Sequence, residues 1–385
     1  MAQARIRSLS RPPLHHFFGY YAVNAWDKSG RYHLALETDF HDHRPRVGDV
    51  AQVGLVDSTN GQFERLSQTA AFNLQQGSMM FWIDAGAGEE FTHNDWEDGR
   101  LVSRAINPHS GGRRTIDGAL AAVSPAGPVG IGLNFARMAL CRPVVGYAGP
   151  LRADQIQRIP DDDGLWRLDL ATGRRELMLS IAQVIAARRV ELTGPAWFNH
   201  VYINPAGRRV MFVCRIRTTP MDQESEWVTS MWTVNLDGTG LHCQIPYGHW
   251  VSHFAWLDDR RILVSTDAPG EPEFYSVTDG QDDFKPFGGG VLTGHAAFSP
   301  NGRWIVFDTG PDRQSRRQVA LYDLVTQRHL SLGHFHHPPP FRGDIRCDPH
   351  PRWRADGRAI TFDSIHEGTR QIYLADVSEI LSQQG

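Results

Sequence analysis

One sequence motif recurs along this chain: a histidine, then a tight turn rich in glycine, asparagine, aspartate or proline, then a short apolar and aromatic run. The turn residues supply the backbone angles that a hairpin needs, and the runs are typical of short strands. The repetition favours a fold assembled from many similar β units. Its clearest copies begin at His200, His295 and His350.

The spacing of these turns predicts the architecture. Turns such as 204–207, 299–302 and 354–357 stand roughly 40 to 55 residues apart, or about twice that, which is the period of a four-stranded propeller blade. A second motif, a strand that ends in Tyr322-Asp323-Leu324 or a close variant, also indicates four-stranded blades. A chain of 385 residues holds six to eight such blades. We expect an all-β, seven-bladed, single-domain β-propeller of residues 1–385.

Composition narrows the function. The formal net charge of −4 and the pI of about 6.5 give no electrostatic footprint for nucleic acid. No apolar run reaches the length of a membrane span, and no signal peptide is visible at the N-terminus. The four cysteines are far apart and show no CxxC spacing, which argues against disulfides or a zinc ribbon. We expect a cytoplasmic protein. The sequence also predicts one clear helix, over residues 177–190.

The recurring histidines are the first candidates for chemistry. The innermost strands of a propeller converge at one end of a central channel, and the residue before each inner hairpin would lie there. Asp348 and His350 alternate along an extended strand and so point to one side. With His295 they form an N/N/O set that suits manganese, zinc, iron or nickel better than calcium. The alternative is that each histidine bonds a buried aspartate to hold a turn. These recurring histidines are His200, His253, His295 and His350.

Cationic and amide side chains form a second group of candidates. Arg215 and Arg217 share one face of a strand, and guanidinium groups match carboxylate geometry. They could equally be outer-surface charges, and the amides could bond the edges of blade backbones. Together they predict a cationic pocket for an anionic substrate. Further members of this group are Asn73, Gln76, Arg137, Arg142 and Tyr147.

Several segments carry a resemblance to a known family. Phe198-Asn199-His200-Val201-Tyr202, Ser252-His253-Phe254-Ala255-Trp256, Gly294-His295 and Asp348-Pro349-His350-Pro351 resemble the oligogalacturonate lyases, which are seven-bladed propellers of the TolB-like type. More broadly, the chain is similar to propeller lyases that act on uronates, ulvan lyases included. The resemblance covers most of the chain and is strongest from Trp197 to Val377.

The resemblance implies a site and a reaction. It implies a divalent cation, typically manganese, on His295 and His350, with Asp348 where the family has another histidine. It also implies His253 as the catalytic base and Arg217 or Arg215 as the substrate arginine. His200 or Tyr202 would pass a proton to the leaving oxygen, and Asn199 would contact the substrate.

The expected reaction is β-elimination in an oligosaccharide that contains 4-linked uronate. Two other classes remain open: a non-catalytic propeller that binds a glycan or peptide, and a metal-dependent hydrolase or epimerase. A prolyl-peptidase is excluded because the sequence has no GxSxG nucleophile elbow.

Overall fold

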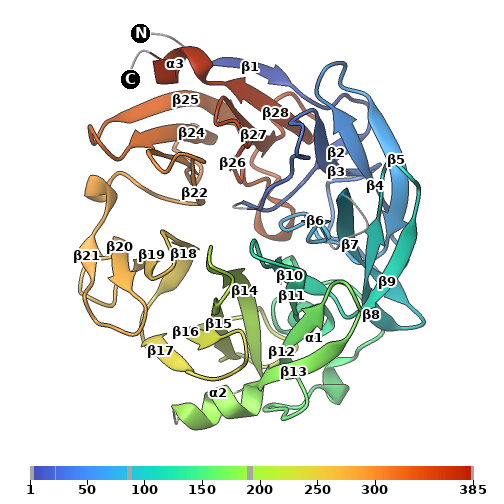
Figure 1. Cartoon of the computed structure of the whole chain (residues 1–385), viewed down its shortest axis with the longest axis vertical. Coiled ribbons are helices and arrows are strands. Elements are labelled where there is room, and N and C mark those ends of the chain that lie inside the picture. The colour runs from blue at the N-terminus through green and yellow to red at the C-terminus, as the bar shows by residue number, and fades with distance from the viewer. Residues whose placement is uncertain (1–3, 22, 85–88, 189–193, 383–385) are drawn as a thin grey trace. The chain divides into compact units, whose positions relative to one another are not determined.

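A computed structural model describes residues 4–21, 23–84, 89–188 and 194–382. Within these ranges, twenty-eight strands form seven four-stranded sheets, the blades of a β-propeller (Figure 1). Neighbouring strands are antiparallel wherever their register is described, and each blade follows chain order except the one that contains both terminal strands. The expected all-β, seven-bladed fold is confirmed.

Contacts divide the chain into two compact units. The first comprises residues up to 69, 73–82 and from 287 onward. It contains three complete blades, whose strands are β2 (His15–Phe17), β3 (Tyr32–Thr38), β4 (Ala51–Asp57) and β5 (Phe63–Thr69); β22 (Ala296–Phe298), β23 (Trp304–Asp308), β24 (Arg316–Asp323) and β25 (His329–His336); and β1 (Arg5–Ser8), β28 (Gln371–Asp376), β27 (Ala359–Ser364) and β26 (Arg352–Trp353).

The second unit comprises residues 70–72 and 83–286. The boundary divides β6 (Phe81–Asp84), which pairs in one sheet with β7 (Glu89–Glu97), β8 (Arg100–Ile106) and β9 (Arg113–Asp117). The remaining sheets are β10 (Leu120–Val123), β11 (Val129–Gly132), β12 (Gly164–Asp169) and β13 (Arg175–Ser180); β14 (Ala196–Ile203), β15 (Arg209–Arg217), β16 (Trp227–Asn235) and β17 (His242–Ile245); and β18 (Val251–Trp256), β19 (Arg261–Thr266), β20 (Glu273–Thr278) and β21 (Lys285–Pro286).

Several middle strands of the blades, among them β15, β19, β23 and β27, are buried over almost their whole length, which explains their long apolar runs. Every residue of β23 is buried, and Trp304 and Val306 pack with Val319, Leu321 and Phe362 in the core of the first unit. A run of four to eight apolar residues between turn signals is what a doubly covered strand requires. The second unit repeats the pattern with Met211, Val213, Phe254, Ile262 and Val264.

The last blade is completed by the start of the chain. β1 pairs antiparallel with β28, with Arg5 opposite Asp376 and Ser8 opposite Tyr373. Arg5 also forms an exposed ion pair of 2.8 Å with Glu379. Hydrogen bonds therefore tie the two ends of the chain into one sheet.

The helices differ from the sequence-based expectation. The helix expected over 177–190 is shorter, because its first residues belong to β13. α2 spans Ile181–Ala187, and Ser180 caps it by accepting from the Gln183 N–H at 3.1 Å. Residues 189 and 190 lie outside the described ranges. The other α-helices are α1 (Phe135–Cys141) and α3 (Ser378–Ser382), and the 3-10 turns are η1 (Pro143–Val145), η2 (Ala153–Gln155), η3 (Gly288–Gly290) and η4 (Gly343–Ile345).

α1 lies outside the one helix that the sequence analysis expected. Its N-cap Asn134 accepts a hydrogen bond from the Arg137 N–H at 2.9 Å. None of the helices in the described ranges is long and apolar enough to cross a membrane.

Candidate active site

The structure brings together the three residues expected to bind a metal ion. One potential ligand atom from each of His295, Asp348 and His350 lies within 4.8 Å of the others. The two imidazole rings meet edge to face, with centroids 4.1 Å apart. All three residues belong to the first unit, where Asp348 and His350 are buried and the His295 side chain is 14% exposed.

A buried carboxylate organises both histidines. Asp308, the last residue of β23, accepts the main-chain N–H of His295 at 2.8 Å and contacts its ring Nδ1 at 3.0 Å. It also accepts the main-chain N–H of His350 at 3.0 Å. A carboxylate on Nδ1 fixes the tautomer that leaves Nε2 with a lone pair for a metal ion. A Cβ on Gly294 would lie 2.3 Å from the same carboxylate, so glycine permits this approach.

Three of the four recurring histidines have left-handed backbone. The φ angles are +48° at His200, +43° at His253 and +44° at His350. The strand register is interrupted beside the first two, between Asn199 and Tyr202 and between Ser252 and Phe254. Non-glycine residues in this region carry strain of about 1–3 kcal/mol and cluster at functional sites. The sequence repeat therefore corresponds to a repeated backbone distortion that redirects a histidine.

Tyr21 is a site residue that the sequence analysis did not single out. Its ring centroid lies 4.7 Å from that of His295 and 5.9 Å from that of His350. The signal available was the aromatic-rich segment 17–21, to which the sequence analysis assigned no role. Tyr21 is buried, and its ring packs against both imidazoles.

Burial and neighbouring charges shift the pKa values of His350 and Asp348. Burial alone would raise the pKa of Asp348, but the guanidinium groups of Arg346 and Arg317 outweigh it and hold the pKa below its ordinary value. Burial, followed by the neighbouring His295, lowers the pKa of His350 well below its ordinary value. A neutral imidazole and an ionised carboxylate are the forms that bind metal ions. The cluster thus fits a divalent transition metal in donor chemistry.

The predicted amide residues Asn73 and Gln76 lie in a tight turn of the first unit. Asn73 pairs with Gly77 through main-chain hydrogen bonds, and its side chain accepts the N–H groups of Gln75 and Gln76 at 3.0 and 2.7 Å. Asn73 therefore shapes the turn. The adjacent Gln75 donates its side-chain amide to the carbonyl of Arg346, which ties this turn to the segment before Asp348.

Four of the predicted residues lie on the first strands of two successive sheets of the second unit. His200, on β14, and His253, on β18, are half-buried. The ring of Phe254 lies edge-on to both His200, at 6.1 Å, and Tyr202, at 5.7 Å. Asn199 is buried and accepts the N–H of His200 at 2.8 Å, so it supports the left-handed turn.

A cationic, aromatic cavity of about 640 Å³ lies in the second unit beside β18. The guanidinium groups of Arg142 and Arg215 lie 4.5 and 5.5 Å from the ring centroid of Trp227. Ser252 lines the cavity, as does Trp250, whose surface is 48% exposed. Two predicted substrate residues therefore share one pocket, where two guanidinium groups against the carboxylate of Glu226 suit an anionic ligand.

The other predicted arginine of this strand has a structural role. Arg217 is 2% exposed and donates to main-chain carbonyls of Cys141, Pro220 and Gln223 at 3.0, 2.9 and 2.6 Å. These bonds hold the loop after β15 against the end of α1. We therefore revise the expectation for Arg217 and leave it out of the proposed catalytic set.

Arg137 and Tyr147 also serve the fold of the second unit. Arg137 donates to the carbonyls of Ala196 and Gln157 at 2.7 and 2.6 Å. Tyr147 is fully buried, accepts from Asn94 at 3.1 Å and stacks on Phe135. Their predicted contact with substrate is revised in the same way.

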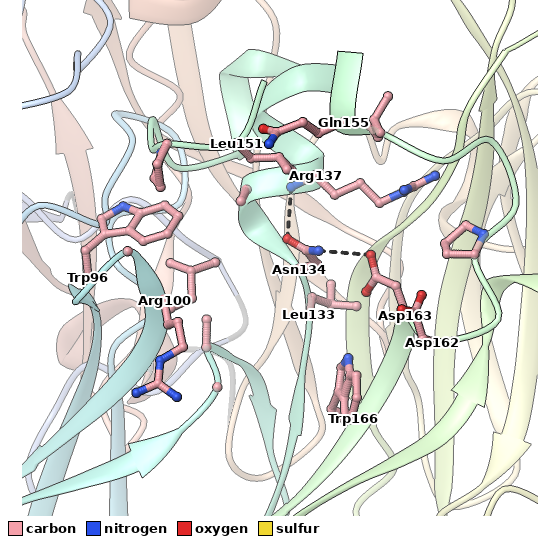
Figure 2. A pocket seen from close by; sticks show the side chains of 18 of the residues that line it. Trp96, Arg100, Leu133, Asn134, Arg137, Leu151, Gln155, Asp162, Asp163 and Trp166 are labelled. Carbon is pink, nitrogen blue, oxygen red and sulfur yellow. Dashed lines mark hydrogen bonds between the residues drawn. The ribbon is translucent and has the colours of Figure 1, made fainter. Parts of the chain in front are cut away.

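A second cavity of the unit, about 600 Å³, lies against Arg137. Figure 2 shows Asn134 in its wall, between the main chain of Arg137 and the carboxylate of Asp163. Trp96 and Trp166 line other parts of the cavity. None of the three residues of the histidine–aspartate cluster belongs to it.

Comparison with known proteins identifies the fold. No family model matches the sequence, and no curated protein sequence matches it. Among solved structures, an oligogalacturonate lyase in complex with manganese matches with a TM-score of 0.66 and 16% identity, over 97% of this chain and 93% of that one. An oligogalacturonate lyase from Vibrio parahaemolyticus gives 0.65 and 15%, over 98% of both chains.

Enzymes of another class share the architecture. A puromycin-hydrolyzing peptidase from Mycobacterium tuberculosis matches with a TM-score of 0.54 and 13% identity, over 93% of this chain and 50% of that chain. The expected resemblance to the lyase propellers is confirmed at the level of the fold. Function has to be argued from the site, because one fold serves many activities.

Proposed function

We propose that this protein is a polysaccharide lyase that cleaves uronate-containing oligosaccharides by metal-assisted β-elimination. The observation that carries the proposal is the cluster of His295, Asp348 and His350, organised by the buried carboxylate of Asp308. Similarity in fold to the oligogalacturonate lyases supports it.

The reaction begins with removal of the proton on C5 of a 4-linked uronate, which is weakly acidic beside an ionised carboxylate. His295, Asp348 and His350 would hold the divalent cation, with manganese our first choice because one of the similar lyases contains it. When bound, such an ion withdraws electron density from the substrate carboxylate and makes the C5 proton easier to remove.

His253 is our candidate for the base. It is half-buried and held at a strained backbone angle, and a neutral imidazole accepts protons near pH 7. The cavity of Arg142, Arg215 and Trp227 would bind a carboxylate of the oligosaccharide through planar guanidinium groups. His200 or Tyr202 would donate a proton to the departing O4.

The test uses purified protein with manganese supplied and three substrates: oligogalacturonate, ulvan oligomers and glucuronan oligomers. Elimination creates a C4–C5 double bond that absorbs in the ultraviolet, so the product reports on the reaction directly. His253→Ala should reduce the rate by about 10²- to 10⁴-fold, the usual contribution of a general base. His109→Ala, at an exposed position of the same unit, is the matched control.

Two results would reject the proposal. One is the absence of unsaturated product from every substrate at saturating manganese. The other is near-normal activity in His253→Ala, which would remove the assigned base. Binding of the oligomers without cleavage would instead favour a glycan-binding propeller, the alternative that the aromatic cavity around Trp227 and Trp250 supports.

A further inference from the structure

Both oxygens of the predicted metal ligand Asp348 are already engaged by guanidinium groups. Arg317 Nη2 lies 2.8 Å from Oδ1, and Arg346 Nε lies 2.7 Å from Oδ2. The Asp348 side chain is 4% exposed, so its carboxylate lies in a low-dielectric environment where charges interact strongly. One carboxylate therefore faces two fixed positive charges beside the imidazole pair.

The two arginines differ in their freedom to move. The Arg317 side chain is 9% exposed and extends from β24, and it also donates to the carbonyl of Thr309 at 3.3 Å. The Arg346 side chain is 30% exposed and follows η4, where it donates to the carbonyl of Gly343 at 3.0 Å. Arg346 can thus leave Asp348 for solvent more easily than Arg317 can.

The main chain at this position does not depend on the Arg346 side chain. Arg370 donates to the carbonyls of Ile345 and Arg346 at 3.0 and 3.1 Å, and Gln75 donates to the latter as well. Arg370 is itself buried and also donates to the carbonyl of Leu74 at 3.0 Å. A substitution of Arg346 therefore leaves Asp348 on a supported backbone.

We propose that Arg346 competes with a divalent cation for Asp348, so that cation binding requires its guanidinium to leave the carboxylate. Arg317 stays in place and compensates part of the ligand's negative charge. Two positive charges next to the carboxylate repel a third, and a carboxylate oxygen engaged by guanidinium is a poorer donor to a metal ion. The cluster consequently binds a divalent cation more weakly than its bare donor set would.

The test is a titration of chelator-treated protein with manganese alone, followed by isothermal calorimetry and free of any substrate or activity. Arg346→Gln should bind manganese at least about tenfold more tightly than the unmodified protein, a change within the range that outer-shell partners of metal ligands produce. Arg346→Met, which keeps the aliphatic stem, is a second variant, and circular dichroism checks that each one folds.

Two controls make the result specific. Arg316→Gln removes the same charge from the same unit, where Arg316 pairs with Asp312 at 2.9 Å on the surface, and should leave the affinity unchanged. Adding Asp348→Asn to Arg346→Gln should abolish the gain. The proposal is overturned if both Arg346 variants bind manganese with unchanged or lower affinity, because Arg346 then supports Asp348 instead of competing for it. Since no sugar is present, failure of the lyase proposal would not affect this measurement.

Discussion

Asp308 ends β23 and His350 lies in the loop before β26, a strand of another sheet, yet the main-chain N–H of His350 donates to the Asp308 carboxylate at 3.0 Å. The same carboxylate contacts the ring Nδ1 of His295 at 3.0 Å. One acidic side chain therefore fixes the ring of one predicted ligand and the backbone of another. The His295–His350 distance follows from this arrangement.

Removing the Asp308 carboxylate should weaken metal binding while the blade remains folded. In Asp308→Ala, we expect manganese affinity to fall by about 10- to 100-fold, because His295 loses the partner that fixes its tautomer. Calorimetric titration measures the change. Asp312→Ala, at an exposed ion pair of the same unit, should bind like the unmodified protein. An Asp308→Ala protein with unchanged affinity would show that the carboxylate does not organise the ligands.

Binding of the oligomers in the cavity beside β18 should depend on arginine, and not only on positive charge, at position 215. Arg215 lies over Trp227 and donates its Nε–H to Thr229 at 3.3 Å, so its fork has a defined orientation. Lysine keeps the charge but cannot bind a carboxylate through two parallel hydrogen bonds. In a His253→Ala background that slows turnover, Arg215→Lys should weaken binding of galacturonate oligomers by about tenfold or more.

The control for this experiment is Arg167→Lys, because Arg167 is half-exposed and pairs with Glu176 at 3.0 Å. Its affinity for the oligomers should not change. Equal binding by the Arg215→Lys and Arg167→Lys proteins would place the substrate carboxylate elsewhere.

The ion pair of Arg352 and Asp363 should be essential for stability. The atoms are 2.7 Å apart, each side chain is 1% exposed, and Asp363 also accepts the N–H of Gly19 at 2.8 Å. Asp363→Ala leaves a buried guanidinium without its counter-ion and should lower the free energy of unfolding by about 3–5 kcal/mol. Chemical denaturation followed by circular dichroism tests this. Asp356→Ala, which breaks a partly exposed pair with Arg354, should cost less than about 1 kcal/mol.

Buried histidines should make the fold sensitive to mild acid. Burial lowers the pKa of His93 to about 4, and its side chain is fully buried on β7. The unfolded chain takes up this proton near pH 6.5, so between pH 6.5 and 4 the unfolded state binds more protons than the folded one. Stability is therefore complete above about pH 6.5 and falls as the pH drops.

For His93 alone, the loss at pH 5 relative to pH 7 is about 2 kcal/mol. Urea denaturation at pH 5, 6 and 7 measures it. His93→Gln removes the titrating group, and its free energy of unfolding should depend less steeply on pH. Parallel pH profiles of the two proteins would contradict the assignment.

The sequence predicts the blades well because their information is local. Turns such as Ser299-Pro300-Asn301-Gly302 need no distant partner to be recognised, and β23 has a fully apolar start because both its faces are covered. The sequence analysis did not predict α1, because its signal is one cap, Asn134, before a helix of only seven residues. A short helix supported by Asn134 and by contacts of the second unit has no periodic pattern to detect.

For a related reason, the sequence predicted the donor residues of the site but not their partners. His295, Asp348 and His350 were found because residue type and spacing reveal donor atoms. The partners of those atoms come from far along the chain, as the pairing of Arg317 with Asp348 shows. Arg217 and Arg215 are equivalent in sequence terms, and only their hydrogen bonds show that one holds a loop while the other lines a cavity.

The pairing of β1 with β28 has a consequence for biosynthesis. The sheet that carries Arg352 and Trp353 lacks one strand until residues 5–8 meet residues 373–376, which the ribosome adds much later. Residues 5–8 cannot take their place in this sheet before then. Joining segments so distant in sequence is slow, so this pairing should set the pace at which newly made molecules mature.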